Sequence, residues 1–445
     1  MKSVYFRIIK ILISVLIICV LFSGCSFRIA SSVDDLIAPV APSGENENVQ
    51  NALNSFCKDG FSLKTPAGGA HTTAYTFFDY DGDGDDEAVV FYEPSSSLGS
   101  INMALIDKIG ENWSVVCNIE GEGSDVYAVD FCDLSGDGTP EFIVLWNVIS
   151  NSSNHLMTVY RQSKGDDGGS VLLTKTEKPV VMNDYIAVDV DEDKQNELVV
   201  FSIQSGESIS ANAVLYRYSD DRLKLLGNTK LDGHINSYKN IKTEKFDDTV
   251  YIYADAVKSN GTEMLTEIIH WSDYYNTIVS PFYSYSTGVT KRTTRSAMLS
   301  SRDINDDGKI EIPLDADFDT PNGVTAVNWK RYENSVLEHT AYSIGVEKDD
   351  YQIVIPDDMF EKIKVRYDFS ESLLTVSDEN DKLVFNVQTV LKSQYTDNSE
   401  NYLSSGYSVI SEDVGYVYLS AVGSESEINV NADDLKNLIK PYKGE

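Results

Sequence analysis

The feature that most constrains the fold is a short acidic segment, DYDGDGDDE, at Asp79–Glu87. It has aspartate at positions one, three and five, glycine at position six and glutamate at position nine. Carboxylates spaced in this way along a tight loop converge on one point, where like charges about 4 Å apart repel by roughly 4 kcal/mol per pair. Oxygen ligands without histidine or thiolate favour Ca²⁺ as the cation that relieves this repulsion. The segment therefore predicts a calcium loop, with glycine at position six because the chain turns there through a positive φ.

The same spacing recurs three times further along the chain, each time before an apolar run: DLSGDGTPE at Asp133–Glu141, DVDEDKQNE at Asp189–Glu197 and DINDDGKIE at Asp303–Glu311. The segments begin at residues 79, 133, 189 and 303, so the intervals are 54, 56 and 114 residues. The last interval is about twice the others, which indicates a further unit near residue 246, where TEKFDDTVYIYAD keeps an alternating strand pattern without the ligands. Repetition with such a period predicts a β-propeller or a related array.

The predicted metal ligands are the side chains at positions one, three, five and nine, together with position seven, which offers its backbone carbonyl. They are Asp79, Asp81, Asp83, Asp85 and Glu87 in the first loop, Asp133, Ser135, Asp137, Thr139 and Glu141 in the second, Asp189, Asp191, Asp193 and Glu197 in the third, and Asp303, Asn305, Asp307, Lys309 and Glu311 in the fourth. Up to four structural Ca²⁺ sites are expected. Occupancy of the third stays open, because Lys194 replaces the glycine at position six.

The pattern D-x-[D/N/S]-x-D-G-x-x-E before an apolar strand resembles the FG-GAP or VCBS-type repeat of integrin-like β-propellers and many bacterial surface proteins. The resemblance covers roughly residues 65–345. It implies a propeller with Ca²⁺ in its blade loops and a role in adhesion or binding, although such propellers carry many activities. An EF-hand fits less well, because Val90 and Leu314 stand where its bidentate glutamate is required.

The start of the chain has the composition of an export signal. Three basic residues precede an apolar run at residues 11–22, and Ser23, Gly24 and Cys25 follow. This pattern is typical of a signal peptide, and the run is short for a membrane span. The cysteine resembles that of the bacterial lipoprotein lipobox, which is lipidated. We expect a lipoprotein signal peptide over residues 1–24, lipidation at Cys25 and an exported protein anchored in the cell membrane outside the cytoplasm; a plain anchor helix is the alternative.

The remaining chain divides by composition. Residues 25–45 are rich in Ser and Pro, which predicts a flexible tether. A mainly β fold is expected, with a calcium-loop propeller of about five blades, possibly more, over residues 46–344, opened by a short amphipathic helix at residues 46–57. The acidic spacing does not recur over residues 345–445, where a small α+β domain is predicted; atypical closing strands are the alternative.

Cysteine and tryptophan positions leave two further alternatives. Three cysteines follow the signal region, without a CxxC pair, and buried thiols are predicted, with a Cys117–Cys132 disulfide as the alternative. The tryptophans are expected in blade cores, with a carbohydrate-stacking platform as the alternative: Trp113, Trp146, Trp271 and Trp329.

The charge and the motifs bound the function. A formal net charge of −34 repels nucleic acid. The sequence has no nucleophile elbow, phosphate-binding loop or Cys/His zinc spacing. We therefore expect no enzyme but a cell-envelope lipoprotein, held to the membrane by its lipid, whose propeller is a binding or scaffold module for an unknown protein or glycan. The alternative is a propeller-type carbohydrate-active hydrolase or lyase, because the sequence does not reveal which of its 70 acids lie close together.

Overall fold

The computed structural model describes residues 44–110, 112–148, 153–164, 171–204 and 209–443. The signal peptide over residues 1–24, the lipidation of Cys25 and nearly all of the tether over residues 25–45 lie outside these residues. Within them, no helix is long and apolar enough to cross a membrane.

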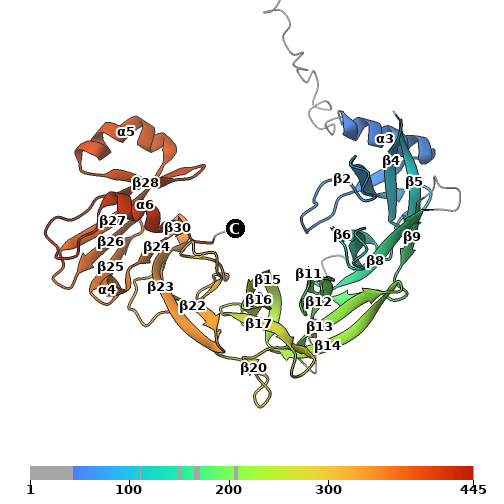
Figure 1. Ribbon diagram of the computed structural model, residues 1–445. Helices are drawn as coiled ribbons and strands as arrows, with labels where there is room; N and C mark the ends of the chain where they lie inside the picture. The colour runs from blue at the N-terminus through green and yellow to red at the C-terminus, as the bar shows by residue number, and fades with distance from the viewer. Residues whose placement is uncertain (1–43, 111, 149–152, 165–170, 205–208, 444–445) are drawn as a thin grey trace, which may run out of the picture.

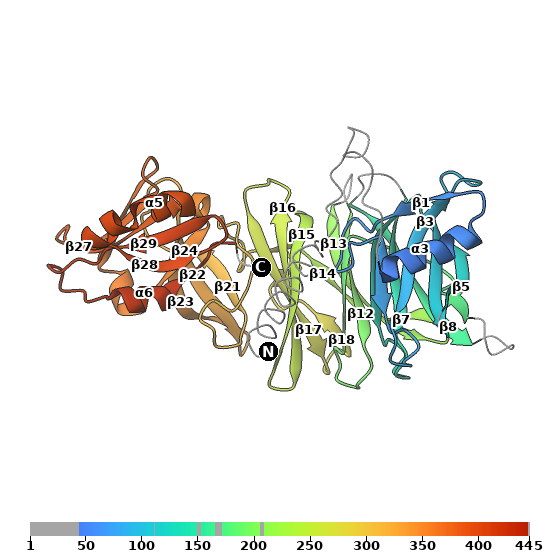
Figure 2. The same cartoon turned by 90° about the horizontal axis from the view of Figure 1, so that it is seen from above.

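Most of the described chain forms antiparallel β-sheets, which confirms the expected mainly β class. Figures 1 and 2 show the sheets following one another along an open curve, with the first sheet and the C-terminal sheet at its two separated ends. We number the larger sheets 1 to 6 in chain order.

Sheet 1 is covered by the helix that the sequence predicts. Helix α3 spans Glu45–Phe56 and buries Val49 and Leu53 fully, because residues four apart share one helical face. The strands of sheet 1 are β1 (Phe61–Lys64), β2 (Tyr75–Phe78), β3 (Glu87–Pro94), β4 (Asn102–Ile109) and β5 (Asn112–Glu120). They pair in the order β1-β3-β4-β5, with β2 also on β3.

The next three sheets repeat this meander. Sheet 2 comprises β6 (Asp125–Cys132), β7 (Glu141–Asn147), β8 (His155–Lys164), β9 (Val171–Lys175) and β10 (Val180–Met182). Sheet 3 comprises β11 (Asp184–Val188), β12 (Glu197–Gln204), β13 (Ser210–Ser219) and β14 (Arg222–Leu231). Sheet 4 comprises β15 (Ile235–Phe246), β16 (Thr249–Lys258), β17 (Met264–Ser272) and β18 (Thr277–Val279).

A small hairpin, β19 (Tyr283–Ser284) and β20 (Val289–Thr290), precedes the last two sheets. Sheet 5 comprises β21 (Glu311–Asp315), β22 (Val324–Glu333), β23 (Val336–Val346), β24 (Tyr351–Ile355) and β30 (Ile439–Pro441). Sheet 6 comprises β25 (Ile363–Asp368), β26 (Leu373–Asp378), β27 (Leu383–Leu391), β28 (Ser408–Glu412) and β29 (Tyr416–Ser420). The helical segments here are η1 (Glu347–Asp349), α4 (Asp357–Phe360), α5 (Lys392–Ser404) and α6 (Ala432–Leu438).

The domain boundary expected at residue 345 lies inside β23 and is corrected by the sheet pairing. Sheet 5 continues from β23 into β24, and β24 pairs with β30 near the end of the chain. One apolar cluster also joins Val346 and Ile353 of sheet 5 to Leu374 and Phe385 of sheet 6. Residues 345–445 therefore complete sheet 5 as well as forming sheet 6, because without β24 one edge of β23 would have unpaired backbone groups.

Apolar clusters fasten each sheet to the next. Phe91 of sheet 1 shares a cluster with Trp146 of sheet 2, and similar clusters join sheets 2 and 3, 3 and 4, and 4 and 5. The core-packing prediction holds for Trp146 and Trp329, which are fully buried, whereas Trp113 and Trp271 are half-buried beside their clusters. Cys57, Cys117 and Cys132 are free thiols, as predicted over the disulfide, but each is half-buried and not fully buried as expected.

Sheet 4 is the unit that the sequence predicts near residue 246 without ligands. Asp247 and Asp248 join β15 to β16, and both have positive φ, 45° and 57°. A two-residue connection with both residues left-handed is typical of a tight hairpin. Sheet 4 therefore has a short turn at the place where sheets 1, 2, 3 and 5 have an acidic loop.

Candidate metal centre

The four acidic loops share the same hydrogen bond and the same two buried side chains. Each ends at the glutamate that begins β3, β7, β12 or β21, and this glutamate is at most 2 % exposed. Its Oε2 accepts a hydrogen bond from the backbone N–H at position two, over 2.8 to 3.2 Å. The side chain at position two is buried in the core: Tyr80, Leu134, Val190 and Ile304. The position-two side chain and the terminal glutamate thus close each loop at both ends.

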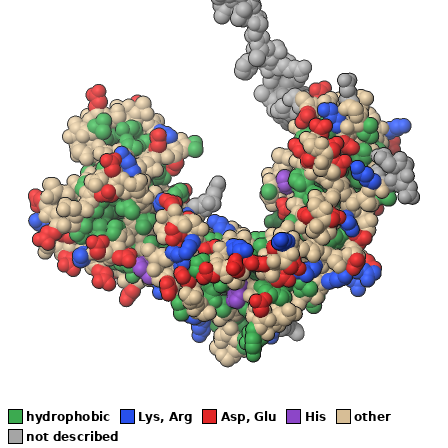
Figure 3. Space-filling model, in the orientation of Figure 1, with side chains coloured by type: hydrophobic (Ala, Val, Ile, Leu, Met, Phe, Trp, Pro, Cys, Tyr) green, Lys and Arg blue, Asp and Glu red, His purple; other side chains and the backbone are tan. Residues whose placement is uncertain are grey.

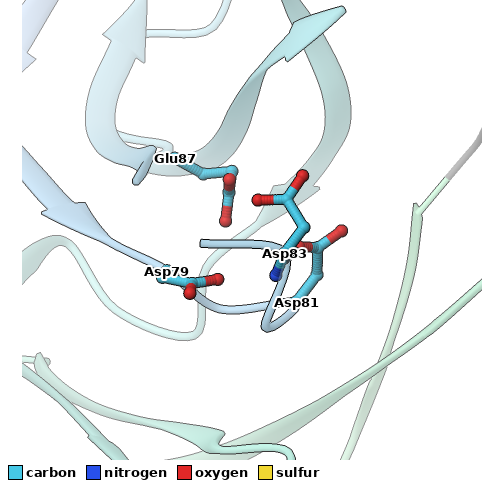
Figure 4. A group of neighbouring side chains, drawn as sticks. All are labelled: Asp79, Asp81, Asp83 and Glu87. Atoms are coloured by element: carbon cyan, nitrogen blue, oxygen red, sulfur yellow. Dashed lines mark hydrogen bonds between the residues drawn. The ribbon is translucent and has the colours of Figure 1, made fainter. Parts of the chain in front are cut away.

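The first loop brings its predicted ligands together. Each of Asp79, Asp81, Asp83 and Glu87 offers an oxygen, and these four oxygens lie within 4.8 Å of one another. Figure 4 shows the four side chains around the turn of the loop, with the Glu87 carboxylate directed into it. Asp79 fixes the turn, because its two oxygens accept hydrogen bonds from the N–H groups of Gly82 at 2.7 Å and Gly84 at 3.1 Å.

The pKa of Glu87 and the ion pairs of the described residues show that the negative charge of the first loop is not balanced by nearby basic side chains. Its pKa is raised to about 7, chiefly by burial; the nearby carboxylates of Asp81, Asp107 and Asp83 also raise it, and the hydrogen bond from the Tyr80 N–H lowers it. None of these acids forms an ion pair with a lysine or arginine of the described chain. A buried carboxylate without a counter-ion favours proton or metal binding.

The backbone at position six behaves as the sequence predicts. Gly84 has a φ of 95°, in the left-handed region that favours glycine. Lys194 takes the same conformation in the third loop, with a φ of 76°. A non-glycine residue in this region costs roughly 1 kcal/mol, so the third loop is held in shape against local strain.

The second loop has the same turn but a looser cluster. Asp133 accepts from Gly136 at 2.7 Å and Gly138 at 2.9 Å, as Asp79 does. Among the described residues, Asp133, Asp137 and Glu141 do not bring three ligand atoms within the distance found in the first loop. The Ser135 hydroxyl is buried without a hydrogen-bond partner.

The third and fourth loops gather three predicted ligands each, Asp189, Asp191 and Glu197 in one and Asp303, Asp307 and Glu311 in the other. Burial raises the pKa of Glu197 and of Glu311 to about 7. Asp193 lies outside the group of its loop, and Asn305 is a neutral amide at position three of the fourth loop. Each accepts a backbone N–H of its own loop, from Gln195 at 3.0 Å and Asp307 at 3.1 Å.

The position-seven residues contact their loops through the backbone. The N–H groups of Asp85, Thr139 and Lys309 donate to the carboxylate at position five, over 2.9 to 3.0 Å. The Lys309 ammonium lies 4.8 Å from the centre of the Phe246 ring, so its side chain turns toward sheet 4.

Three arginines that are not part of the predicted ligand pattern contact the acidic loops. Arg161, Arg217 and Arg331 come from β8, β13 and β22, and each contacts the loop of its own sheet. Each lies 20 residues after the terminal glutamate of its loop, and the residue at this spacing in the first sheet is Asp107. The interval of 20 residues is visible in the sequence. It indicates a contact only once it is known that the strand beginning at the glutamate pairs with the next strand, which carries the arginine or Asp107.

The comparisons with known proteins assign no family. No family model matches the chain, and no curated protein matches it. Among solved structures, Sqt1 of Chaetomium thermophilum has a TM-score of 0.31 and 7 % sequence identity, over 67 % of this chain and 78 % of that one. This likeness is below the level that carries an argument about fold or function.

Proposed function

We propose that this chain is an exported lipoprotein of the bacterial cell envelope, built from propeller-type blades with FG-GAP or VCBS-like loops and stabilised by Ca²⁺. Its role is that of a binding or scaffold module for a protein or glycan. The observation that carries the proposal is the first acidic loop, where four carboxylates converge without an internal cation. The five successive antiparallel sheets joined by apolar clusters support the blade interpretation.

The loops also have a structural task between sheets. The Tyr80 carbonyl in the first loop accepts a hydrogen bond from Gln162 of sheet 2. The Leu134 carbonyl in the second loop accepts from Gln195 in the third loop at 2.7 Å. In the fourth loop, the Ile310 N–H donates to Glu244 of sheet 4 at 3.0 Å. An ordered loop therefore fixes the contact between neighbouring sheets.

Asp79, Asp81, Asp83 and Glu87 are the residues that would hold the ion, because oxygen ligands on a short loop suit Ca²⁺. Bound Ca²⁺ would supply the positive charge that keeps these carboxylates ionised and close together. The chain itself fixes the turn through Asp79 and joins the loop to β3 through Glu87. Metal binding and local folding are then one event.

A binding role fits the overall shape. The sheets line an open curve in Figure 1, and repeat arrays commonly bind partners along such a concave surface. Figure 3 shows Asp and Glu side chains exposed on many parts of the visible face, in keeping with the formal charge of −34. This charge favours a protein or neutral glycan partner over nucleic acid.

One carboxylate pair outside the loops does not support the enzyme alternative. This pair is Asp232 and Glu267, and both side chains are 0 % exposed. Their oxygens already accept hydrogen bonds from backbone and hydroxyl groups, including Ser280 and Thr290. A glycan could not reach this pair in the folded chain.

Thermal unfolding tests the calcium part of the proposal. A chain beginning at residue 44 should melt at a higher temperature in 1 mM CaCl₂ than in excess EGTA. At a calcium concentration about 100 times Kd, one site adds roughly 2.7 kcal/mol. Mg²⁺ at the same concentration should give little change. Equal melting temperatures in all three buffers would overturn the calcium proposal.

Cell fractionation tests the envelope part. The full-length protein should sediment with membranes, and a Cys25→Ala variant should lose its lipid attachment. Metabolic labelling with a palmitate analogue gives the direct readout. A wild-type protein without label would contradict the lipoprotein assignment.

A further inference from the structure

One cross-strand position differs between the first loop and the other three. The residue after each terminal glutamate pairs across the sheet with a known partner: Ala88 with Ile106, Phe142 with Tyr160, Leu198 with Tyr216, and Ile312 with Lys330. The next residue along the partner strand therefore lies opposite the glutamate. It is aspartate in sheet 1 and arginine in the others: Asp107, Arg161, Arg217 and Arg331.

Arg217 is the most fully engaged of these arginines. Its Nη2 lies 2.9 Å from Asp191, 2.8 Å from Asp193 and 2.5 Å from Glu197. Its Nε donates a second hydrogen bond to Glu197, at 3.0 Å. The guanidinium thus contacts three of the four side chains predicted to bind metal in the third loop.

The second and fourth loops have the same arrangement with fewer contacts. Arg161 lies 2.7 Å from Asp137 and 3.9 Å from Glu141. Arg331 lies 2.9 Å from Asp307 and 3.7 Å from Glu311. Glu311 Oε1 and Arg331 Nε are both buried without a hydrogen-bond partner, so this pair is the least complete.

Sheet 1 has a carboxylate where the others have a guanidinium. Asp107 adds a fifth acid beside the first loop, and its pKa is raised by burial and by Asp81, Asp83 and Asp85. Glu87 is 2 % exposed, and within the described chain only its Oε2 accepts a hydrogen bond. Its second oxygen is left for a ligand, and Figure 4 shows the carboxylate directed into the loop.

We propose that the residue opposite the terminal glutamate decides how each loop is neutralised. Asp107 makes the first loop the divalent-cation site, whereas Arg161, Arg217 and Arg331 act as built-in counter-ions that take the place of metal in the other three. The assignment of metal to the first loop rests on the proposed function; the exclusion from the other three rests on the arginine contacts.

The physical basis is competition for the same oxygens. A Ca²⁺ ion needs six to eight oxygen ligands at about 2.3–2.6 Å, so ligands held by a guanidinium are not free to bind it. A guanidinium about 4 Å away would also repel a divalent ion, and this repulsion is twice that of a monovalent ion at the same distance. Arginine keeps its charge at any physiological pH, so the internal counter-ion is permanent.

The test counts Ca²⁺ ions bound per full-length chain by equilibrium dialysis, with affinity measured by titration calorimetry. We expect one site in the wild type and none in Asp107→Arg, whose melting temperature in EGTA should rise, because the new cation relieves the repulsion. Arg331→Asp copies the first-loop pattern into the fourth loop and should bind two ions. Arg222→Asp is the matched control, because Arg222 forms an exposed ion pair with Glu177. This variant should still bind one Ca²⁺ ion.

The outcomes separate this inference from the proposed function. Three or four ions on the wild type would overturn the arginine inference and leave the calcium proposal standing. No ion on the wild type would overturn the calcium proposal, and the inference would then fail as well unless Arg331→Asp gained a site. If Arg331→Asp is unfolded in EGTA, recovery of its melting transition with Ca²⁺ supports the inference, and failure to recover counts against it.

Discussion

The first and third acidic loops have the same carboxylate spacing but are neutralised differently. Both have aspartate at positions one, three and five and a buried glutamate at position nine whose pKa is raised to about 7. In the first loop, position six is glycine and the opposite strand supplies Asp107; in the third, these are Lys194 and Arg217. The comparison teaches that a metal-binding spacing does not by itself require a metal, because a neighbouring strand can supply the cation.

Sheet 4 adds a third way of holding a buried glutamate. Glu267 is 0 % exposed and has no arginine beside it. Its oxygens accept from the Asp232 N–H at 2.7 Å, Ser280 at 3.0 Å and Thr290 at 2.9 Å. Four variants test whether these three environments differ as their contacts indicate.

The largest effect is expected from Arg217→Met. The change leaves Asp191, Asp193 and the fully buried Glu197 without a cation, and removal of one partner of a buried pair costs about 3–5 kcal/mol. Urea unfolding in EGTA measures this loss. Arg222→Met is the control, because its exposed pair with Glu177 contributes about 0–1 kcal/mol. Equal losses in the two variants would contradict the built-in role of Arg217.

The next effect concerns the calcium-dependent part of stability. Glu87→Gln removes a buried ligand and should abolish the Ca²⁺-induced gain, roughly 2.7 kcal/mol at 100 times Kd. Glu197→Gln changes the matching residue of the third loop and should keep the full gain. Melting curves with CaCl₂ and with EGTA give both values. A gain that survives in Glu87→Gln would place the ion elsewhere.

Glu267→Gln tests a buried carboxyl group without metal or arginine. Burial raises the pKa of Glu267 from its ordinary 4.5 to about 7, so the folded state keeps a proton that the unfolded state releases. The stability it contributes is therefore present below about pH 4.5 and is lost as the pH rises through 7. The variant has no ionisable group here and does not lose this stability. The free energy of unfolding of the variant minus that of the wild type should therefore increase by about 1–3 kcal/mol between pH 4.5 and 8. Urea unfolding at fixed calcium across this range measures the difference, and a constant difference would show that Glu267 is ionised throughout.

The smallest effect is expected from Lys194→Gly. Glycine relieves the left-handed conformation at φ 76° and should add about 0.5–1 kcal/mol. The number of bound Ca²⁺ ions should not change, because Arg217 remains in the loop. Gly84→Lys is the reverse change in the first loop, at φ 95°, and should lose stability. A second bound ion in Lys194→Gly would mean that the backbone, and not Arg217, decides occupancy.

Local sequence was sufficient for features set within a few residues. The acidic spacing located all four loops, the glycine at position six has its expected positive φ in Gly84, and the unit near residue 246 lacks the loop as expected. Helix α3 also follows from its apolar spacing. These features depend on chain geometry over one turn, which the residue order fixes directly.

Features set by pairing between distant strands were missed or misplaced. The boundary at residue 345 was wrong because β24 completes sheet 5 and is itself covered by β30 from the end of the chain. Arg161, Arg217 and Arg331 contact the acidic loops from a neighbouring strand, and the ligand pattern did not predict them. Such contacts depend on which strand ends lie together, and spacing along the chain does not reveal this.

The sequence alone determined where the four acidic loops lie and that a strand follows each of them. Only the tertiary structure decided what neutralises each cluster, because the residue opposite Glu87, Glu141, Glu197 or Glu311 lies one strand away and is fixed by hairpin register. The difference has a simple physical origin. Repulsion within a loop acts over a few ångströms of one segment, whereas the charge that balances it can come from any strand that the sheet places alongside.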